Sequence, residues 1–62
     1  MITINGEATA VAPNTPLLAL VPREGRGVAV ARNGEVVPRS EWATTAVSDG
    51  DRIEILEASP GG

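Results

Sequence analysis

The two glycines at positions 61 and 62 carry the clearest chemistry in this sequence. Glycine has no Cβ, so the groups of another protein can approach its backbone closely. The α-carboxylate of a terminal glycine is an anion at neutral pH, because its ordinary pKa is about 3.5. The anion is a poor acyl electrophile, whereas its mixed anhydride with AMP is a good one. No side chain would then shield the Gly62 carbonyl from an incoming sulfur nucleophile.

The other side chains offer few groups for catalysis. The chain has no His, Cys or Tyr, and its five cations are all arginines. Most of the usual nucleophiles, general bases and zinc ligands are therefore missing. Asp49 and Asp51 flank Gly50, which is typical of a tight turn, and a calcium loop needs more oxygen ligands than this spacing supplies. We predict no catalytic residue, no metal site and no cofactor bound by this chain.

Residues 58–62 form a run of small residues after a predicted strand. Such a run is often only a disordered terminus. Fully extended, it would span about 17 Å, enough to enter a narrow active site while the globular part docks outside. We predict a globular domain over residues 1–57 and a flexible tail over 58–62, with Gly61 and Pro60 entering the active site of a partner. Pro60 stiffens the backbone, which would either help or hinder that insertion.

Size and charge restrict what the rest of the chain can be. A chain of 62 residues forms one small domain, and the 42% of its residues that are hydrophobic favour a packed globule over disorder. The net charge of −3 argues against a nucleic-acid partner, which requires a basic face. No apolar run approaches about 20 residues, the length of a membrane span. With no signal-peptide pattern and no cysteine, we expect a cytoplasmic protein with no membrane partner.

Two Asn-Gly pairs mark the predicted hairpins of the domain. Asn5-Gly6 and Asn33-Gly34 suit type I′ turns, because both central residues of that turn take positive φ. The flanking alternation predicts strands near residues 1–5 and 7–12 around the first turn, and near 28–31 and 35–37 around the second. Residues 52–56, with Ile53 and Ile55 on one face, predict a final strand.

One short helix is predicted between the hairpins. Thr15 supplies a capping hydroxyl, Pro16 suits the first helical position, and Pro22 limits the helix to about two turns. Ser40 is predicted to cap a single turn that places Trp42 over the core, although Trp42 could also anchor a partner. The order ββαββ indicates an α+β fold in which the first and last strands pair in parallel at the sheet centre.

Four segments carry a resemblance to a known family. They are ITINGE near the start, GVAVARNGEVVPRSEWA in the middle, SDGDRIEIL near the end, and the final GG. With these segments the chain resembles the ThiS family of sulfur carriers from thiamin biosynthesis. The resemblance implies a ubiquitin-like β-grasp, an α+β fold in which a mixed sheet of four to five strands carries one short helix on one face.

The resemblance also implies that the chain is a protein substrate and not an enzyme. An E1-like adenylating enzyme of the ThiF type would use ATP to adenylate Gly62, and a sulfur-donating enzyme would provide the sulfur of a thiocarboxylate. Gly61 would be the glycine that threads through the partner's active site. A thiazole synthase of the ThiG type would take up this sulfur to build the thiazole ring of thiamin.

Two alternatives stay open at the level of sequence. One is a related β-grasp sulfur carrier for molybdopterin or cysteine synthesis, and the other is a ubiquitin-like protein modifier or interaction module. The terminal Gly-Gly does not separate them, because all ubiquitin-like proteins share it. The short length and the VPRSEW block favour the thiazole route.

Overall fold

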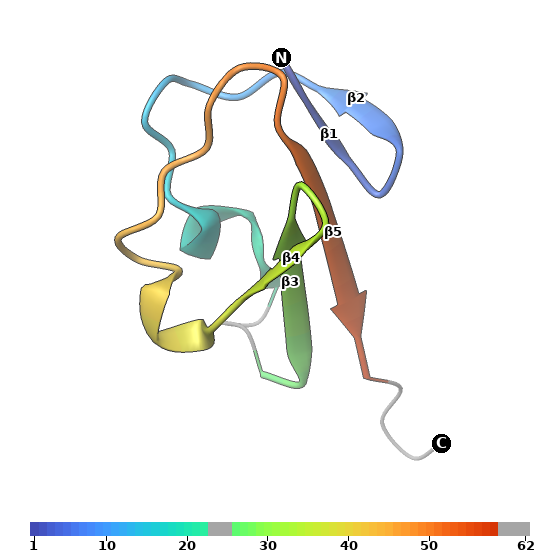
Figure 1. Cartoon of the computed structure of the whole chain (residues 1–62), viewed down its shortest axis with the longest axis vertical. Coiled ribbons are helices and arrows are strands. Elements are labelled where there is room, and N and C mark those ends of the chain that lie inside the picture. Colours follow the sequence, from blue (N-terminus) through green and yellow to red (C-terminus); the bar gives the residue numbers. More distant parts are fainter. Residues whose placement is uncertain (23–25, 59–62) are drawn as a thin grey trace.

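The computed structural model describes residues 1–22 and 26–58 of the chain. Within these residues, five strands form one mixed sheet in the order β2-β1-β5-β3-β4 (Figure 1). The strands are β1 (Ile2–Ile4), β2 (Glu7–Thr9), β3 (Val28–Arg32), β4 (Glu35–Val37) and β5 (Arg52–Glu57). Strand β5 lies at the centre, parallel to β1 and antiparallel to β3. The predicted mixed sheet and its parallel central pair are therefore confirmed.

The two Asn-Gly pairs form the expected hairpin turns. Asn5 and Gly6 have φ values of 51° and 83°, and Asn33 and Gly34 have nearly the same values, 52° and 84°. All four residues thus take the positive φ that a type I′ turn requires. The predicted second strand was too long, because β2 ends at Thr9, which pairs with Ile2 at the start of β1. Residues beyond Thr9 have no further β1 residues with which to pair.

Each asparagine also fastens its hairpin to the central strand. Asn5 accepts a hydrogen bond from the Ile55 amide at 2.8 Å through Oδ1 and donates one to the Ile55 carbonyl at 3.1 Å through Nδ2. Asn33 accepts a hydrogen bond from the Arg52 amide at 2.9 Å. These side chains form hydrogen bonds with amide and carbonyl groups of the β5 backbone, which would otherwise need other partners. The same two residues therefore make the turns and hold β5 between the hairpins.

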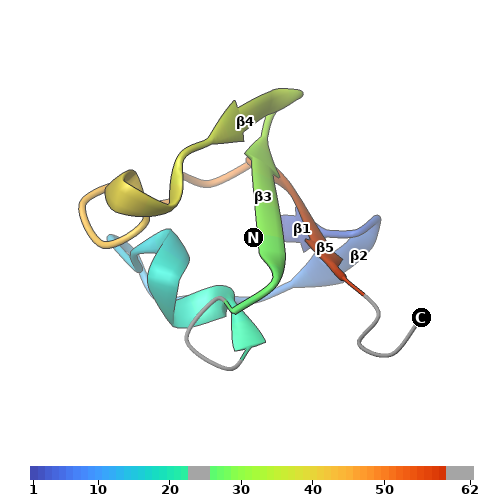
Figure 2. The same ribbon diagram turned by 90° about the horizontal axis from the view of Figure 1, so that it is seen from below.

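Two short 3-10 helices, η1 (Leu17–Leu20) and η3 (Arg39–Glu41), lie on one side of the sheet (Figure 2). The predicted cap at Thr15 is wrong: Pro16 precedes η1 without a side-chain cap, and the Thr15 hydroxyl donates to the Ala12 carbonyl at 2.6 Å. The first amides of η1 find tertiary partners instead. The Leu17 amide donates to the Thr45 carbonyl at 2.9 Å, and the Leu18 amide donates to the Trp42 carbonyl at 3.1 Å.

The predicted cap at Ser40 is also wrong. Pro38 precedes η3, again without a side-chain cap, and Ser40 lies inside the helix. The amides of Glu41 and Trp42 instead donate to the carbonyls of Pro38 and Arg39, at 2.9 and 3.2 Å. Backbone bonds within this single turn take the place of the expected hydroxyl.

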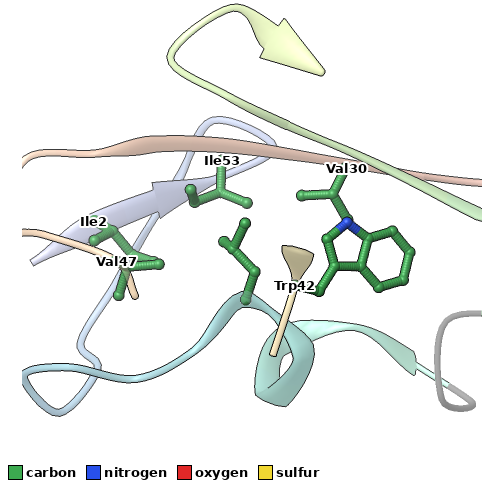
Figure 3. Packing of buried hydrophobic residues seen from close by; sticks show 6 residues of the cluster. Ile2, Val30, Trp42, Val47 and Ile53 are labelled. Carbon is green, nitrogen blue, oxygen red and sulfur yellow. The ribbon is translucent and has the colours of Figure 1, made fainter. Parts of the chain in front are cut away.

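The hydrophobic core lies between the sheet and the two helices (Figure 3). Its buried members are Ile2, Leu17, Val30, Trp42, Val47 and Ile53. Trp42 is 1% exposed, and its indole N–H donates to the Val37 carbonyl at 2.9 Å. A buried indole needs such a partner, because an unpaired donor inside the protein is costly. The prediction that Trp42 covers the core is confirmed.

Asp51 is a buried carboxylate that ties the turn before β5 to the second hairpin. Its Oδ2 accepts hydrogen bonds from the Ser48 amide and from Arg32 Nε, both at 2.8 Å, and its Oδ1 accepts one from Asn33 at 3.0 Å. Burial pushes the pKa of Asp51 upward. The hydrogen bonds from Ser48, Asn33 and Arg32, with the Arg32 charge, outweigh that effect and lower the pKa below its ordinary 3.8.

This lowered pKa predicts an acid-sensitive contribution to folding. Because the folded pKa lies below the unfolded one, the stabilisation is present above about pH 4 and is lost as the pH falls through the folded pKa. We expect Asp51→Asn to lower the free energy of unfolding by about 1–3 kcal/mol at pH 7 and by progressively less as the pH falls through the folded pKa. Urea unfolding over a series of decreasing pH values measures the change.

The exposed Glu54, two strand positions after Arg52 on β5, provides a matched control. Glu54→Gln removes one carboxylate without removing a buried hydrogen-bond acceptor, so we expect a change within about 0.5 kcal/mol across the same pH series. A loss for Asp51→Asn that stays constant down to a pH at which NMR shows the Asp51 carboxyl of the natural chain to be protonated would show that the ionised carboxylate is not what stabilises this turn.

Candidate functional site

The candidate site begins where β5 leaves the sheet. Gly62, Gly61 and Pro60, the residues that the sequence assigns to the reaction and to tail insertion, lie outside the described residues. The structure therefore places the base of the tail, and Ala58 is the last residue that it describes. β5 lies between β1 and β3, and its last residues pair with β3, so the tail is attached to the most central strand of the sheet (Figure 1).

Ala58 continues the sheet by one hydrogen bond. The last register pair of β3 and β5 joins Val28 to Glu57. One residue further, the Ala58 amide donates to the Gly27 carbonyl at 2.7 Å. The sequence predicts Ala58 as part of the tail, and this hydrogen bond was not predicted, because it joins two segments that are about thirty positions apart. The one available signal was a glycine directly before a strand, a position that often requires unusual φ.

The outer face of the sheet, which turns away from the two helices, is apolar around this exit. Val30 is buried, so its strand neighbours Ala29 and Ala31 point to the opposite face. Leu56 pairs with Ala29, and Val36 pairs with Ala31, so both large side chains lie on that same outer face. Leu56 is 71% and Val36 74% exposed. This face thus presents two large apolar side chains and two small ones, with the exposed Glu54 beside Leu56 on the same face.

A shallow hollow on the molecule's surface also lies against the base of the tail. It is lined by the first residues of β3, by the last residues of β5 with Ala58, and by Arg39. Leu56 belongs both to this hollow and to the apolar outer face. An exposed apolar patch that is surrounded by polar residues is typical of protein-binding surfaces. A protein that acts on the tail would therefore meet an apolar surface at its base.

The carboxylates of the turn before β5 are engaged within the protein. Asp51 accepts hydrogen bonds from three donors of this chain, and Asp49 forms an ion pair with the N-terminal ammonium of Met1. Gly50 between them has φ +88°, and the Asp51 amide donates to the Ser48 carbonyl at 3.0 Å. This is the tight turn that the sequence predicts. Across residues 1–22 and 26–58, no three His, Cys, Asp or Glu side chains gather as metal ligands would.

In the same described ranges, no helix is long and apolar enough to cross a membrane.

Comparisons with known proteins agree with this geometry. A model of the ThiS family matches residues 2–62. The sulfur carrier protein ThiS of Escherichia coli is 39% identical over 46 residues, which are 74% of this chain and 70% of that protein. A thiazole synthase of Paramagnetospirillum magneticum is 42% identical over 64 residues, which are 98% of this chain and 20% of that protein. This chain thus spans about a fifth of the length of that relative.

A solved structure has the same fold. The crystal structure of a thiamine biosynthesis protein (ThiS) from Geobacter metallireducens superposes with a TM-score of 0.79 and 34% sequence identity. The match covers 98% of this chain and 97% of that one. The family model and the solved structure match nearly the full length, the Escherichia coli relative matches 74% of it, and the chain belongs to the ThiS family.

Proposed function

We propose that this chain is a sulfur carrier of thiamin biosynthesis and that the carboxylate of Gly62 is the reacting group. One observation carries the proposal: in a ThiS-family scaffold the central strand ends at Glu57, five positions before Gly62 in the sequence, beside an exposed apolar face. The buried acid and the turn carboxylates are all engaged in holding the fold. In this proposal the chain is a substrate of other enzymes and binds no cofactor itself.

The proposed reaction has two covalent steps. First, a carboxylate oxygen of Gly62 attacks the α-phosphorus of ATP, and pyrophosphate leaves, which gives an acyl adenylate. Second, a sulfur nucleophile at the oxidation level of sulfide attacks the carbonyl carbon, and AMP leaves with the oxygen that joined it to the acyl group. The product is a thiocarboxylate. The lack of a side chain on Gly62 keeps both faces of that carbonyl open to attack.

The partners follow from these two steps and from the relatives. An E1-like adenylating enzyme would catalyse the first step with ATP, and a sulfur-donating enzyme would provide the sulfur nucleophile of the second step. A thiazole synthase would then take sulfur from the thiocarboxylate, since one relative of that name contains a region similar to this whole chain. Leu56 and Val36 give these enzymes an apolar surface to dock on while they act on the tail.

Intact-mass measurement tests the proposal. The chain is incubated with ATP, bisulfide and its cognate adenylating enzyme, and we expect one oxygen to be exchanged for one sulfur. The control reaction omits ATP and should leave the mass unchanged. If neither adenylate nor thiocarboxylate forms while the Escherichia coli carrier reacts in a parallel assay, the proposal is wrong. Intact mass of the carrier isolated from cells shows whether it bears sulfur, and fragmentation of its C-terminal peptide shows whether that sulfur is on Gly62.

A further inference from the structure

We propose that Gly27 is a positioning residue for the reaction at Gly62, because its carbonyl anchors the tail at Ala58. This inference rests on the proposed function. With Ala58 held to the sheet, a partner's active site would reach the Gly62 carboxylate through residues 59–62 alone. The anchor thus fixes both the starting point and the initial direction of the segment that reacts.

The first step of the argument is the register of the sheet. The pairs of β3 with β5 run without interruption from Arg32 and Ile53 to Val28 and Glu57. The Ala58 amide then donates to the Gly27 carbonyl at 2.7 Å, a short hydrogen bond just beyond the end of the strand. Ala58 therefore keeps the alignment of the ladder and is not the first residue of an untethered tail.

The second step is the backbone of Gly27. Its φ is +67°, in the left-handed region that residues with a Cβ rarely adopt. Space is not the restriction, because a Cβ at this position would lie 3.7 Å from the Ala58 Cβ, an ordinary contact. A side chain at position 27 would instead favour another φ, which changes how the preceding loop is oriented relative to the peptide plane that carries the Gly27 carbonyl. The glycine thus lets the loop enter β3 while this carbonyl faces the Ala58 amide.

The third step is the effect on reach and on entropy. Four fully extended residues span about 13 Å, compared with about 17 Å for five, so the anchor shortens the distance that the carboxylate can reach from the sheet. Fixing the backbone of one more residue disfavours an ordered state by about five- to thirtyfold. Because the sheet already holds Ala58, insertion into an active site would not have to order that residue.

Gly6 provides a matched control for the backbone strain. Its φ is +83°, also left-handed, and an added Cβ would meet nothing within 4 Å. It lies in the turn between β1 and β2, and β2 is an edge strand on the side of β5 away from β3. Gly6→Ala therefore introduces a similar conformational penalty without touching the hydrogen bond at Ala58.

The test uses four chains made by total synthesis: the natural sequence, Gly27→Ala, Gly6→Ala, and a chain with lactic acid in place of Ala58. The last variant replaces one amide by an ester, which removes the donor and leaves Gly27 unchanged. Adenylation kcat and KM are measured with the cognate enzyme at a temperature where all four chains are folded by circular dichroism. Hydrogen exchange of the Ala58 amide is followed by NMR in the three chains that retain it.

We expect Gly27→Ala and the ester each to lower kcat/KM about five- to thirtyfold and Gly6→Ala to leave it within about twofold. Gly27→Ala should also accelerate exchange of the Ala58 amide, whereas Gly6→Ala should not. If the ester reacts as fast as the natural chain, the anchor has no role in the reaction, although the proposed function stands. If the natural chain does not react at all, the proposed function is wrong and this inference fails with it.

Discussion

A chain that carries a carboxamide in place of the Gly62 carboxylate should form no thiocarboxylate with the adenylating enzyme, ATP and bisulfide. The carboxylate oxygen is the atom that attacks the α-phosphorus of ATP, and a neutral amide offers no equivalent nucleophile. The expected effect is therefore a loss below detection, the largest that we predict for any single change in this protein.

The control is the same synthetic chain with its free carboxylate. Both chains should unfold at the same urea concentration, because the buried core comprises residues between Ile2 and Ile53. Intact mass after the reaction gives the result directly. A sulfur-for-oxygen exchange in the carboxamide chain would place the reacting carboxyl on a side chain, such as that of Glu57, and would contradict the proposed role of Gly62.

Trp42→Ala is the second prediction, and it concerns the fold. Trp42 is 1% exposed and is the largest side chain of the core. Its removal leaves a cavity, and truncating a buried aromatic residue to alanine typically destabilises a protein by about 3–5 kcal/mol. At about 0.05–0.15 kcal/mol per residue, a domain of this size has only about 3–9 kcal/mol of stability in total. We expect the variant to be largely unfolded at 37 °C, and circular dichroism measures this directly. A urea titration followed by circular dichroism gives the midpoint of unfolding for the variant and for the natural chain.

Two control variants separate the causes of that loss. Trp42→Phe keeps an aromatic ring but removes the N–H that donates to the Val37 carbonyl. This variant should still unfold cooperatively, at a lower urea concentration than the natural chain. Leu56→Ala removes a large apolar side chain that is 71% exposed, and its unfolding should change by no more than about 0.5 kcal/mol. A Trp42→Ala chain that unfolds at the natural midpoint would contradict the assignment of Trp42 to the core.

The sequence predicted the parts of the fold that depend on neighbouring residues. Asn5-Gly6 and Asn33-Gly34 specify their turns locally, because few other pairs tolerate two successive positive φ values. The parallel pairing of β1 and β5 followed from topology, since parallel strands need a long crossover between them. The predicted core position of Trp42 followed from the size and apolarity of an indole in a chain with no other aromatic residue.

What could not be predicted depends on contacts between distant residues. The helix η1 does without a capping hydroxyl because Thr45, almost thirty positions later, provides the carbonyl for its first amide. Asp51 appeared to be an ordinary turn residue, and only the register of β3 beside β5 brings Arg32 and Asn33 to its carboxylate. The role of Gly62 remains a prediction, because the structure describes the chain only as far as Ala58.

The central position of β5 has a consequence for biosynthesis. A ribosome makes this strand after both hairpins, so β1 and β3 emerge without the neighbour that joins them. Translation that stops before Arg52 would release a chain whose Ile2 and Val30 lack Ile53 as a packing partner. We expect such a fragment not to fold. Chains that end before β5 would therefore not accumulate as folded decoys that occupy the adenylating enzyme.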